Sequence, residues 1–164
     1  MEFGYFGRYC FLGGLCYRFD GSDDRADQVA QQGVLLVRDF REHVPRFRQP
    51  TPDAPIGYCH ELEGDLQLLG GRGGHRDAYE AALERYEAVD NPRQWSCEPE
   101  FHTLATTLVD LADAAGEPLD EETTAQLRDL SLTGRVEYKL SNFVDIIEAA
   151  VETGRIVPSS EYSE

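Results

Sequence analysis

Basic residues and long apolar runs are both scarce in this sequence. It has 15 arginines and lysines, of which Lys139 is the only lysine, against 31 acidic residues, and its formal net charge is −16. Affinity for duplex nucleic acid depends on basic side chains that neutralise phosphates, and docking on anionic lipids also needs basic clusters. We therefore expect neither direct nucleic-acid binding nor membrane docking. A basic protein is the natural electrostatic partner of such a chain.

Cysteines are also few, and they are scattered. Cys10, Cys16, Cys59 and Cys97 do not form the dense pattern of a disulfide scaffold. No stretch approaches the roughly 18 consecutive apolar residues of a membrane span. The glycine-interrupted start lacks the basic region and clean apolar run of a secretory signal. These features predict a soluble, cytoplasmic protein with reduced thiols.

Sequence patterns of catalysis and cofactor binding are missing as well. There is no G-x-S-x-G motif, no H-E-x-x-H pair and no phosphate-loop or dinucleotide-binding pattern. Cys59 and His60, with Cys97 and His102, are zinc-ligand types, but they lack two tight pairs of the Cys-x-x-Cys kind. Buried thiols explain these cysteines better. We predict no catalytic residues, no cofactor and no metal site.

The negative charge is concentrated in the C-terminal two thirds of the chain. Residues 1–50 carry seven acids and seven bases, whereas residues 51–97 carry nine acids and four bases. Residues 98–134 carry nine acids and a single base, and residues 135–164 carry six acids and three bases. A salt-adapted proteome would acidify the whole surface, so it explains this asymmetry less well than a functional acidic face does.

Aromatic residues are dense in the first nineteen positions, on both sides of Gly13-Gly14. Two glycines between aromatic-rich runs are typical of a two-residue hairpin turn, because glycine supplies positive φ at both central positions. We predict an aromatic β-hairpin over residues 1–21, with a glycine-broken helix as the alternative. Its aromatic side chains belong to the core or, where exposed, to an interface.

From residue 22 onward, apolar residues recur at helical spacing. Ser22 is a predicted N-cap, Asp120 is another, and Gly116 and Gly154 are predicted helix ends. The segment over 56–69 is predicted as a helix, although Leu66-Gln67-Leu68 alternates as a strand would. The predicted fold is mostly α, a single-domain bundle of five or six helices with the hairpin packed on it. Its expected parts are the hairpin at 1–21, the helical bundle at 22–157 and a frayed tail at 158–164.

A glycine-rich loop at 70–74 leads directly into a predicted helix. Backbone of this kind can cradle a phosphate at a helix N-terminus, and Arg72, His75 and Arg76 would add charge and an acid. Asp77 would oppose an anion there, and a plain helix–helix loop is the alternative. This loop is a candidate anion-binding site. If it binds phosphate, the chain is a small enzyme or a ligand-binding domain for a phosphorylated small molecule.

The acidic residues of 98–134 form the main candidate site. They fall on two predicted helices and their connection. Like charges on one helix face destabilise it slightly, which suggests a partner, and solvation of an exposed face is the alternative. Their spacing could also mimic a row of phosphates. The predicted partner-binding residues are Glu98, Glu100, Asp110, Asp113, Glu117, Asp120, Glu121, Glu122 and Asp129.

In size, charge and lack of catalytic motifs, the chain resembles small acidic inhibitors such as toxin-immunity and phage anti-defence proteins. That resemblance implies a non-enzymatic protein that masks a basic, nucleic-acid-handling protein. The alternatives are the anion-binding loop and a structural subunit whose N-terminal hairpin pairs with another chain. The sequence leaves the oligomeric state open.

Overall fold

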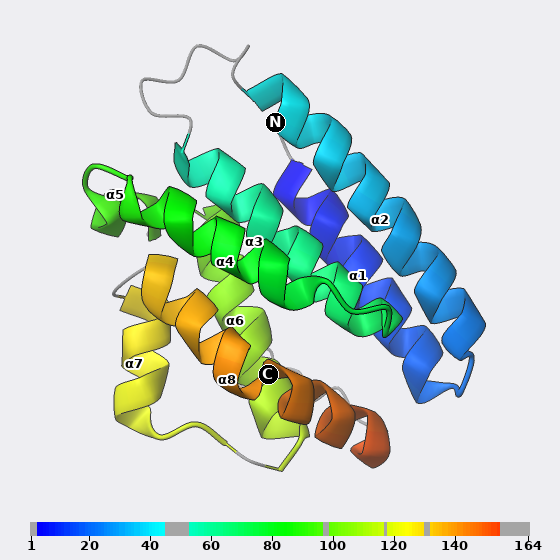
Figure 1. Ribbon diagram of the computed structural model, residues 1–164. Helices are drawn as coiled ribbons and strands as arrows, with labels where there is room; N and C mark the ends of the chain where they lie inside the picture. The colour runs from blue at the N-terminus through cyan, green and yellow to red at the C-terminus, as the bar shows by residue number, and fades with distance from the viewer. Residues whose placement is uncertain (1–2, 45–52, 97–98, 117, 130–131, 155–164) are drawn as a thin grey trace.

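The computed structural model is a helical bundle (Figure 1) and describes residues 3–44, 53–96, 99–116, 118–129 and 132–154. No strand occurs within these residues, and no helix among them is long and apolar enough to cross a bilayer. In chain order the helices are α1 (Phe3–Phe19), α2 (Asp23–His43), α3 (Asp53–Gly70), α4 (His75–Glu87), α5 (Pro92–Ser96), α6 (Pro99–Ala114), α7 (Glu121–Asp129) and α8 (Leu132–Thr153).

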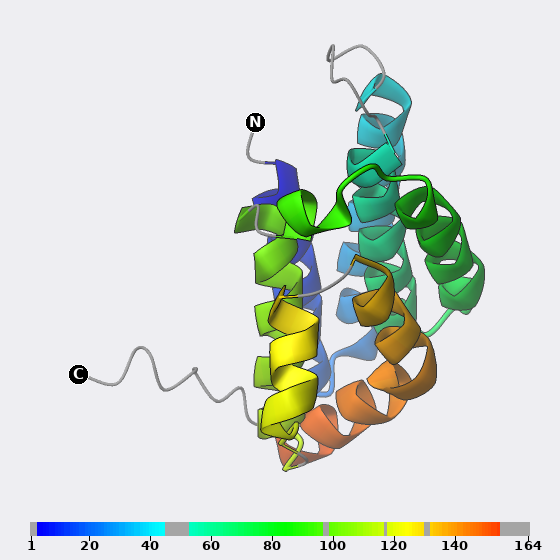
Figure 2. The same cartoon turned by 90° about the vertical axis from the view of Figure 1, so that its left-hand side faces the viewer.

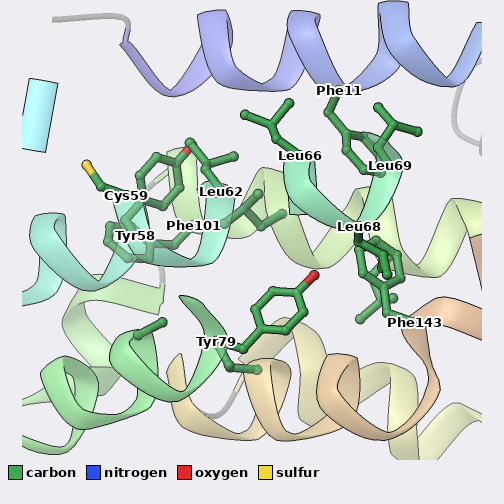
Figure 3. Packing of buried hydrophobic residues seen from close by; sticks show 14 of the residues in the cluster. Phe11, Tyr58, Cys59, Leu62, Leu66, Leu68, Leu69, Tyr79, Phe101 and Phe143 are labelled. Carbon is green, nitrogen blue, oxygen red and sulfur yellow. The ribbon is translucent and has the colours of Figure 1, made fainter. Parts of the chain in front are cut away.

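Helix α3 lies in the middle of the bundle. It packs between α2 and α4 and also contacts α1, while α8 packs on α4 and α6 (Figures 1 and 2). Most residues of α3 are buried, on several sides of the helix. Figure 3 shows Leu62, Leu66 and Leu69 of α3 within the apolar core, with Phe11 of α1 nearby. A helix enclosed in this way has no single apolar stripe, which explains its ambiguous sequence pattern.

The predicted β-hairpin over residues 1–21 is wrong, because Phe3–Phe19 is the single helix α1. Gly7 and Gly14 of this helix are packing positions and not turn residues. A Cβ on Gly7 would lie 2.8 Å from Leu62 Cδ1, and a Cβ on Gly14 would lie 2.5 Å from Leu69 Cδ2. The glycines are seven residues apart, as are the leucines, so α1 and α3 run parallel with glycine opposite leucine. The missing side chains make room for close helix packing.

Helices α3 and α4 meet in the same way, but here tyrosines fill the space. A Cβ on Gly57 would lie 2.5 Å from the Tyr86 ring, and one on Gly64 would lie 2.5 Å from the Tyr79 ring. Both tyrosines are fully buried. Glycine inside these helices therefore has a tertiary reason, which outweighs its unfavourable helix propensity of about 1 kcal/mol.

Most of the other helix predictions agree with the structure. Helix α2 follows Ser22, but the Ser22 hydroxyl donates to Asp20 and makes no capping hydrogen bond to the helix, so the predicted side-chain cap is not formed. Helix α6 begins at Pro99. Gly116 and Gly154 follow α6 and α8 with φ of 79° and 63°, as expected of glycine at a helix end. The short helix α5 was not predicted, and the predicted tail at 158–164 lies outside the described residues.

The N-terminal aromatic residues divide between core and surface. Phe11 is buried and stacks at 6.1 Å on Phe143 of α8, whereas Phe6 and Tyr9 are exposed on α1. Pairing of an N-terminal hairpin with another chain is no longer available as a mode of association, since this segment is helical.

Candidate functional site

The predicted acidic site is centred on the end of α6, the start of α7 and the connection between them. Asp113 on α6 is exposed, and Asp110, one turn earlier, is half-buried. On α6, Leu104, Leu108 and Leu111 are buried. Three further predicted acids are exposed at the start of α7: Asp120, Glu121 and Glu122.

Four of the nine predicted residues cannot be assigned to this surface. Glu98 and Glu117 lie outside the described residues. Glu100 belongs to α6 and Asp129 ends α7, but the structure describes only the backbone there. The described part of the predicted site is therefore smaller than the sequence suggested.

Asp120 has a structural task besides its charge. Its Oδ1 accepts a hydrogen bond from the backbone N–H of Thr123 at 2.7 Å, and its Oδ2 accepts one from the Thr123 hydroxyl at 2.9 Å. These bonds lower the pKa of Asp120, the backbone bond most of all. Asp120 is thus the N-cap of α7, as predicted, and its carboxylate stays ionised beside Glu121 and Glu122.

Helix α8 carries an acidic strip that sequence reasoning missed. Glu137, Asp145, Glu148 and Glu152 are all exposed and are spaced i, i+8, i+11 and i+15. At about 100° per residue they fall within about 80° of one another on the helix surface. We call these four residues the α8 acidic strip. The helical spacing was available in the sequence, but the two bases of α8 made this segment look less acidic than 98–134.

Those two bases, Arg135 and Lys139, lie inside the protein. Their side chains are each only 1% exposed, on the face of α8 opposite the acidic strip. Every other basic or acidic side chain of α8 belongs to the strip. The outer surface of this helix therefore carries four carboxylates and no basic group.

Buried carboxylates on α3 neutralise both bases. Arg135 donates to Glu61 from Nε and from a terminal nitrogen, each at 2.6 Å. Lys139 Nζ donates to both oxygens of Asp65 at 2.8 and 2.7 Å and lies 2.9 Å from Glu61 Oε1. Because Glu61 and Asp65 are one helical turn apart, as are Arg135 and Lys139, one face of α3 matches one face of α8.

Two tyrosines of α4 complete this buried network. Tyr86 donates its hydroxyl proton to Glu61 at 2.9 Å, and Tyr79 donates to Asp65 at 2.7 Å. Burial and the adjacent carboxylates raise the pKa of both tyrosines well above the usual value, so both hydroxyls remain protonated donors. Each buried carboxylate thus has a basic partner and a neutral donor.

The two carboxylates respond differently to this environment. Burial raises the pKa of Glu61, but the charges of Arg135 and Lys139 outweigh that effect and lower it to about 2. Burial dominates at Asp65 and raises its pKa, with Lys139 opposing the change. Since Lys139 is shared between the two carboxylates, Glu61 is the more firmly ionised of the pair.

A second ion cluster joins α3 to α2 and is partly open to solvent. Glu63 accepts hydrogen bonds from Arg38 at 2.8 and 2.6 Å and from Arg41 at 2.6 Å. Arg41 also donates to His60 Nδ1 at 2.9 Å, which places the imidazole proton on Nε2. Burial and the Arg41 charge lower the pKa of His60 to about 4, so this histidine is neutral at pH 7.

The predicted anion-binding residues each lie beside a neighbouring side chain. Arg72 donates to Asp27 of α2, and Arg76 lies 3.9 Å from Glu80. His75 makes an edge contact with the Tyr79 ring. The three residues are close in sequence, but each of them contacts a different side chain. Anion binding by this loop stays a prediction.

Among the described residues, no group of three or more metal-ligating side chains gathers in one place. Cys59 is fully buried in α3, which agrees with the buried-thiol interpretation. Cys97 lies outside the described residues, and the side chain of His102 is outside what the structure describes.

Comparison with known proteins finds no family model, no curated protein and no solved structure that matches this chain.

Proposed function

We propose that this chain is a non-enzymatic binding protein that masks a basic protein with the acidic surface of its C-terminal helices. The proposed contact surface comprises the α8 acidic strip and the exposed acids Asp113, Asp120, Glu121 and Glu122. The proposed partner handles nucleic acid, because a positive site that accepts phosphates would also accept a row of carboxylates.

The observation that carries this proposal is the orientation of α8. A helix in an ordinary solvated surface mixes acids with exposed bases, which is favourable at i, i+4. Helix α8 instead buries both of its bases and leaves the acids outside. The like charges of Glu148 with Asp145 and Glu152 cost its helix a few tenths of a kcal/mol per pair.

The N-terminal helices provide a contrast within the same molecule. The surface of α2 exposes Arg25 and Arg38 together with Asp23, Asp39 and Glu42. A proteome-wide acidification would act on both surfaces alike. The difference between them favours a dedicated acidic surface on α8.

The proposed mechanism has two steps. The field of the acidic surface first accelerates encounter with a positively charged partner, an effect that weakens as salt screens the charges. The helices then cover the positive site and exclude its nucleic acid. The chain needs no catalytic group for this function.

The test compares two variants with the same change in net charge. The first neutralises the α8 acidic strip as Glu137→Gln, Asp145→Asn, Glu148→Gln and Glu152→Gln. The matched control neutralises four exposed acids on and after α4, as Glu80→Gln, Glu84→Gln, Glu87→Gln and Asp90→Asn. Each immobilised protein is incubated with extract of the native host, and retained proteins are quantified by mass spectrometry.

We expect the wild-type chain and the α4 control to retain the same basic protein, and the α8 variant to retain much less of it. Equal retention by both variants would contradict the proposal. So would a retained partner that is itself acidic, because such a partner is not attracted by this surface.

A further inference from the structure

A groove between α2 and α3 lies apart from the acidic helices. It has a volume of about 250 Å³ and opens beside the loop that joins α3 to α4. Its floor is apolar and includes Ala30, Val34 and Leu66, while the exposed Leu35 extends its rim. Helices α2 and α3 pack against each other in the bundle (Figure 1). A volume below the usual range for drug-sized ligands suits a small molecule.

Two buried acceptor atoms at the loop end of this groove receive no hydrogen bond from any residue that the structure describes. Asp27 Oδ2 accepts from Arg72 and, at 2.8 Å, from Gln31, but Asp27 Oδ1 has no donor. Gln67 Nε2 donates to Glu63 at 3.3 Å, which leaves Gln67 Oε1 without a donor. Buried acceptors of this kind are uncommon in folded proteins, because an unmade hydrogen bond is destabilising.

A guanidinium lies at the same end of the groove. Arg72 is bound to Asp27 and its side chain is 64% exposed, so it can turn toward a ligand without disturbing the core. The other basic group of the groove, Arg38, is bound to Glu63, which also accepts a hydrogen bond from Gln67. Asp27, Gln67 and Arg72 all line the groove, so it offers two acceptors and one exposed cation.

We propose that this groove binds a free α-amino acid with an apolar side chain. The ammonium group donates to Asp27 Oδ1 and Gln67 Oε1, and the carboxylate accepts from Arg72. The side chain lies on Ala30, Val34 and Leu66. An α-amino acid carries its ammonium and carboxylate on one carbon, which matches the adjacent positions of Asp27 and Arg72. This proposal does not depend on the function proposed for the acidic helices.

The test is isothermal titration calorimetry with L-leucine and L-phenylalanine on the intact protein. N-acetyl-L-leucine lacks the ammonium group, and isoamylamine lacks the carboxylate, so each removes one half of the recognition. We expect saturable binding of at least one amino acid at one site per chain, and a loss of about tenfold or more in affinity for each analogue.

Three variants locate the binding. Asp27→Asn and Arg72→Gln should each weaken binding by about tenfold or more, whereas Glu42→Gln, an exposed site elsewhere on α2, should not change it. Arg72 is exposed, so its variant is expected to fold, and circular dichroism checks all three. No heat of binding for either amino acid would overturn the proposal, as would unchanged affinity after N-acetylation. Binding of inorganic phosphate in place of the amino acids would also overturn it.

Discussion

Four charged side chains in the interior determine which charges are left on the outer face of α8. Arg135 and Lys139 are buried on the inner face of α8, where they neutralise Glu61 and Asp65. Buried ion pairs add little stability on balance, because desolvation offsets their attraction. Removal of one partner is different, since it leaves a buried charge uncompensated.

The Glu61→Gln substitution tests this interior network. The new amide would direct its N–H₂ group toward donors of Arg135, Lys139 or Tyr86, and Arg135 would lose its counter-charge. We expect the free energy of unfolding to fall by about 3–5 kcal/mol, measured by urea denaturation at pH 7. The exposed Glu137→Gln on α8 serves as the control and should change it by less than about 0.5 kcal/mol. A loss below about 1 kcal/mol for Glu61→Gln would contradict the described network.

His60 predicts a pH dependence that is separate from that of the carboxylates. Its pKa is lowered from 6.5 to about 4 in the folded protein by burial and the Arg41 charge. As the pH falls, His60 therefore takes up a proton in the unfolded chain before it does so in the folded protein. The free energy of unfolding is not reduced by this group above pH 6.5, and it decreases as the pH falls from 6.5 toward 4.

We expect wild-type stability to decline from about pH 6.5 to about pH 4.5, before most carboxylates titrate. In His60→Gln this part of the decline should be reduced. The measurement is the free energy of unfolding across that pH range for both proteins. Parallel curves for the two proteins would show that His60 is not held neutral in the fold.

At the scale of elements, glycines opposite large side chains set the spacing of α1, α3 and α4. Leu62 and Leu69 occupy the positions of side chains that Gly7 and Gly14 lack, and Tyr86 and Tyr79 do the same at Gly57 and Gly64. Such contacts bring helix backbones close together, and an added methyl group would have to displace a packed side chain.

Gly13 and Gly14 form a matched pair for a test of this packing. A Cβ on Gly13 would have nothing within 4 Å, whereas one on Gly14 would lie 2.5 Å from Leu69. We expect Gly13→Ala to be neutral or to stabilise by up to about 1 kcal/mol through helix propensity. Gly14→Ala should destabilise by about 1–3 kcal/mol. Thermal or urea unfolding measures both, and a strong loss in Gly13→Ala would instead favour a glycine turn at this position.

The same two glycines show where prediction from the sequence ends. A Gly-Gly pair between apolar runs fits a hairpin turn or a close helix contact, and the difference depends on Leu69, more than fifty residues away. The amphipathic helices α6 and α8 were predictable because each buries one face, and that face is readable from its spacing. Helix α3 was harder, because it is buried on several sides.

The acidic site was predictable only in part, for a related reason. A charge count from the sequence includes Arg135 and Lys139 as if they were on the surface. Residues 135–164 therefore looked only mildly acidic. Their partners Glu61 and Asp65 are 74 residues away in sequence, and no local pattern reveals that pairing. The acidic strip of α8 became visible once its bases were placed in the core.

At the scale of the whole molecule, the helices near the two ends of the chain differ in the charges that they expose. The early helices expose both signs of charge, and α8 exposes carboxylates without a base. An electrostatic partner surface of this kind should bind with an affinity that depends on salt and on the position of the charges, and not on net charge alone.

The most direct measurement is the dissociation constant of the retained basic partner at low and high salt, for wild type, the α8 variant and the α4 control. We predict that wild-type affinity weakens with salt and that neutralising the α8 strip weakens it by about tenfold or more, corresponding to ~1.4 kcal/mol. The α4 control should stay close to wild type. Affinity that is independent of salt, or equal losses in the two variants, would contradict the proposal that the C-terminal helices mask a basic protein.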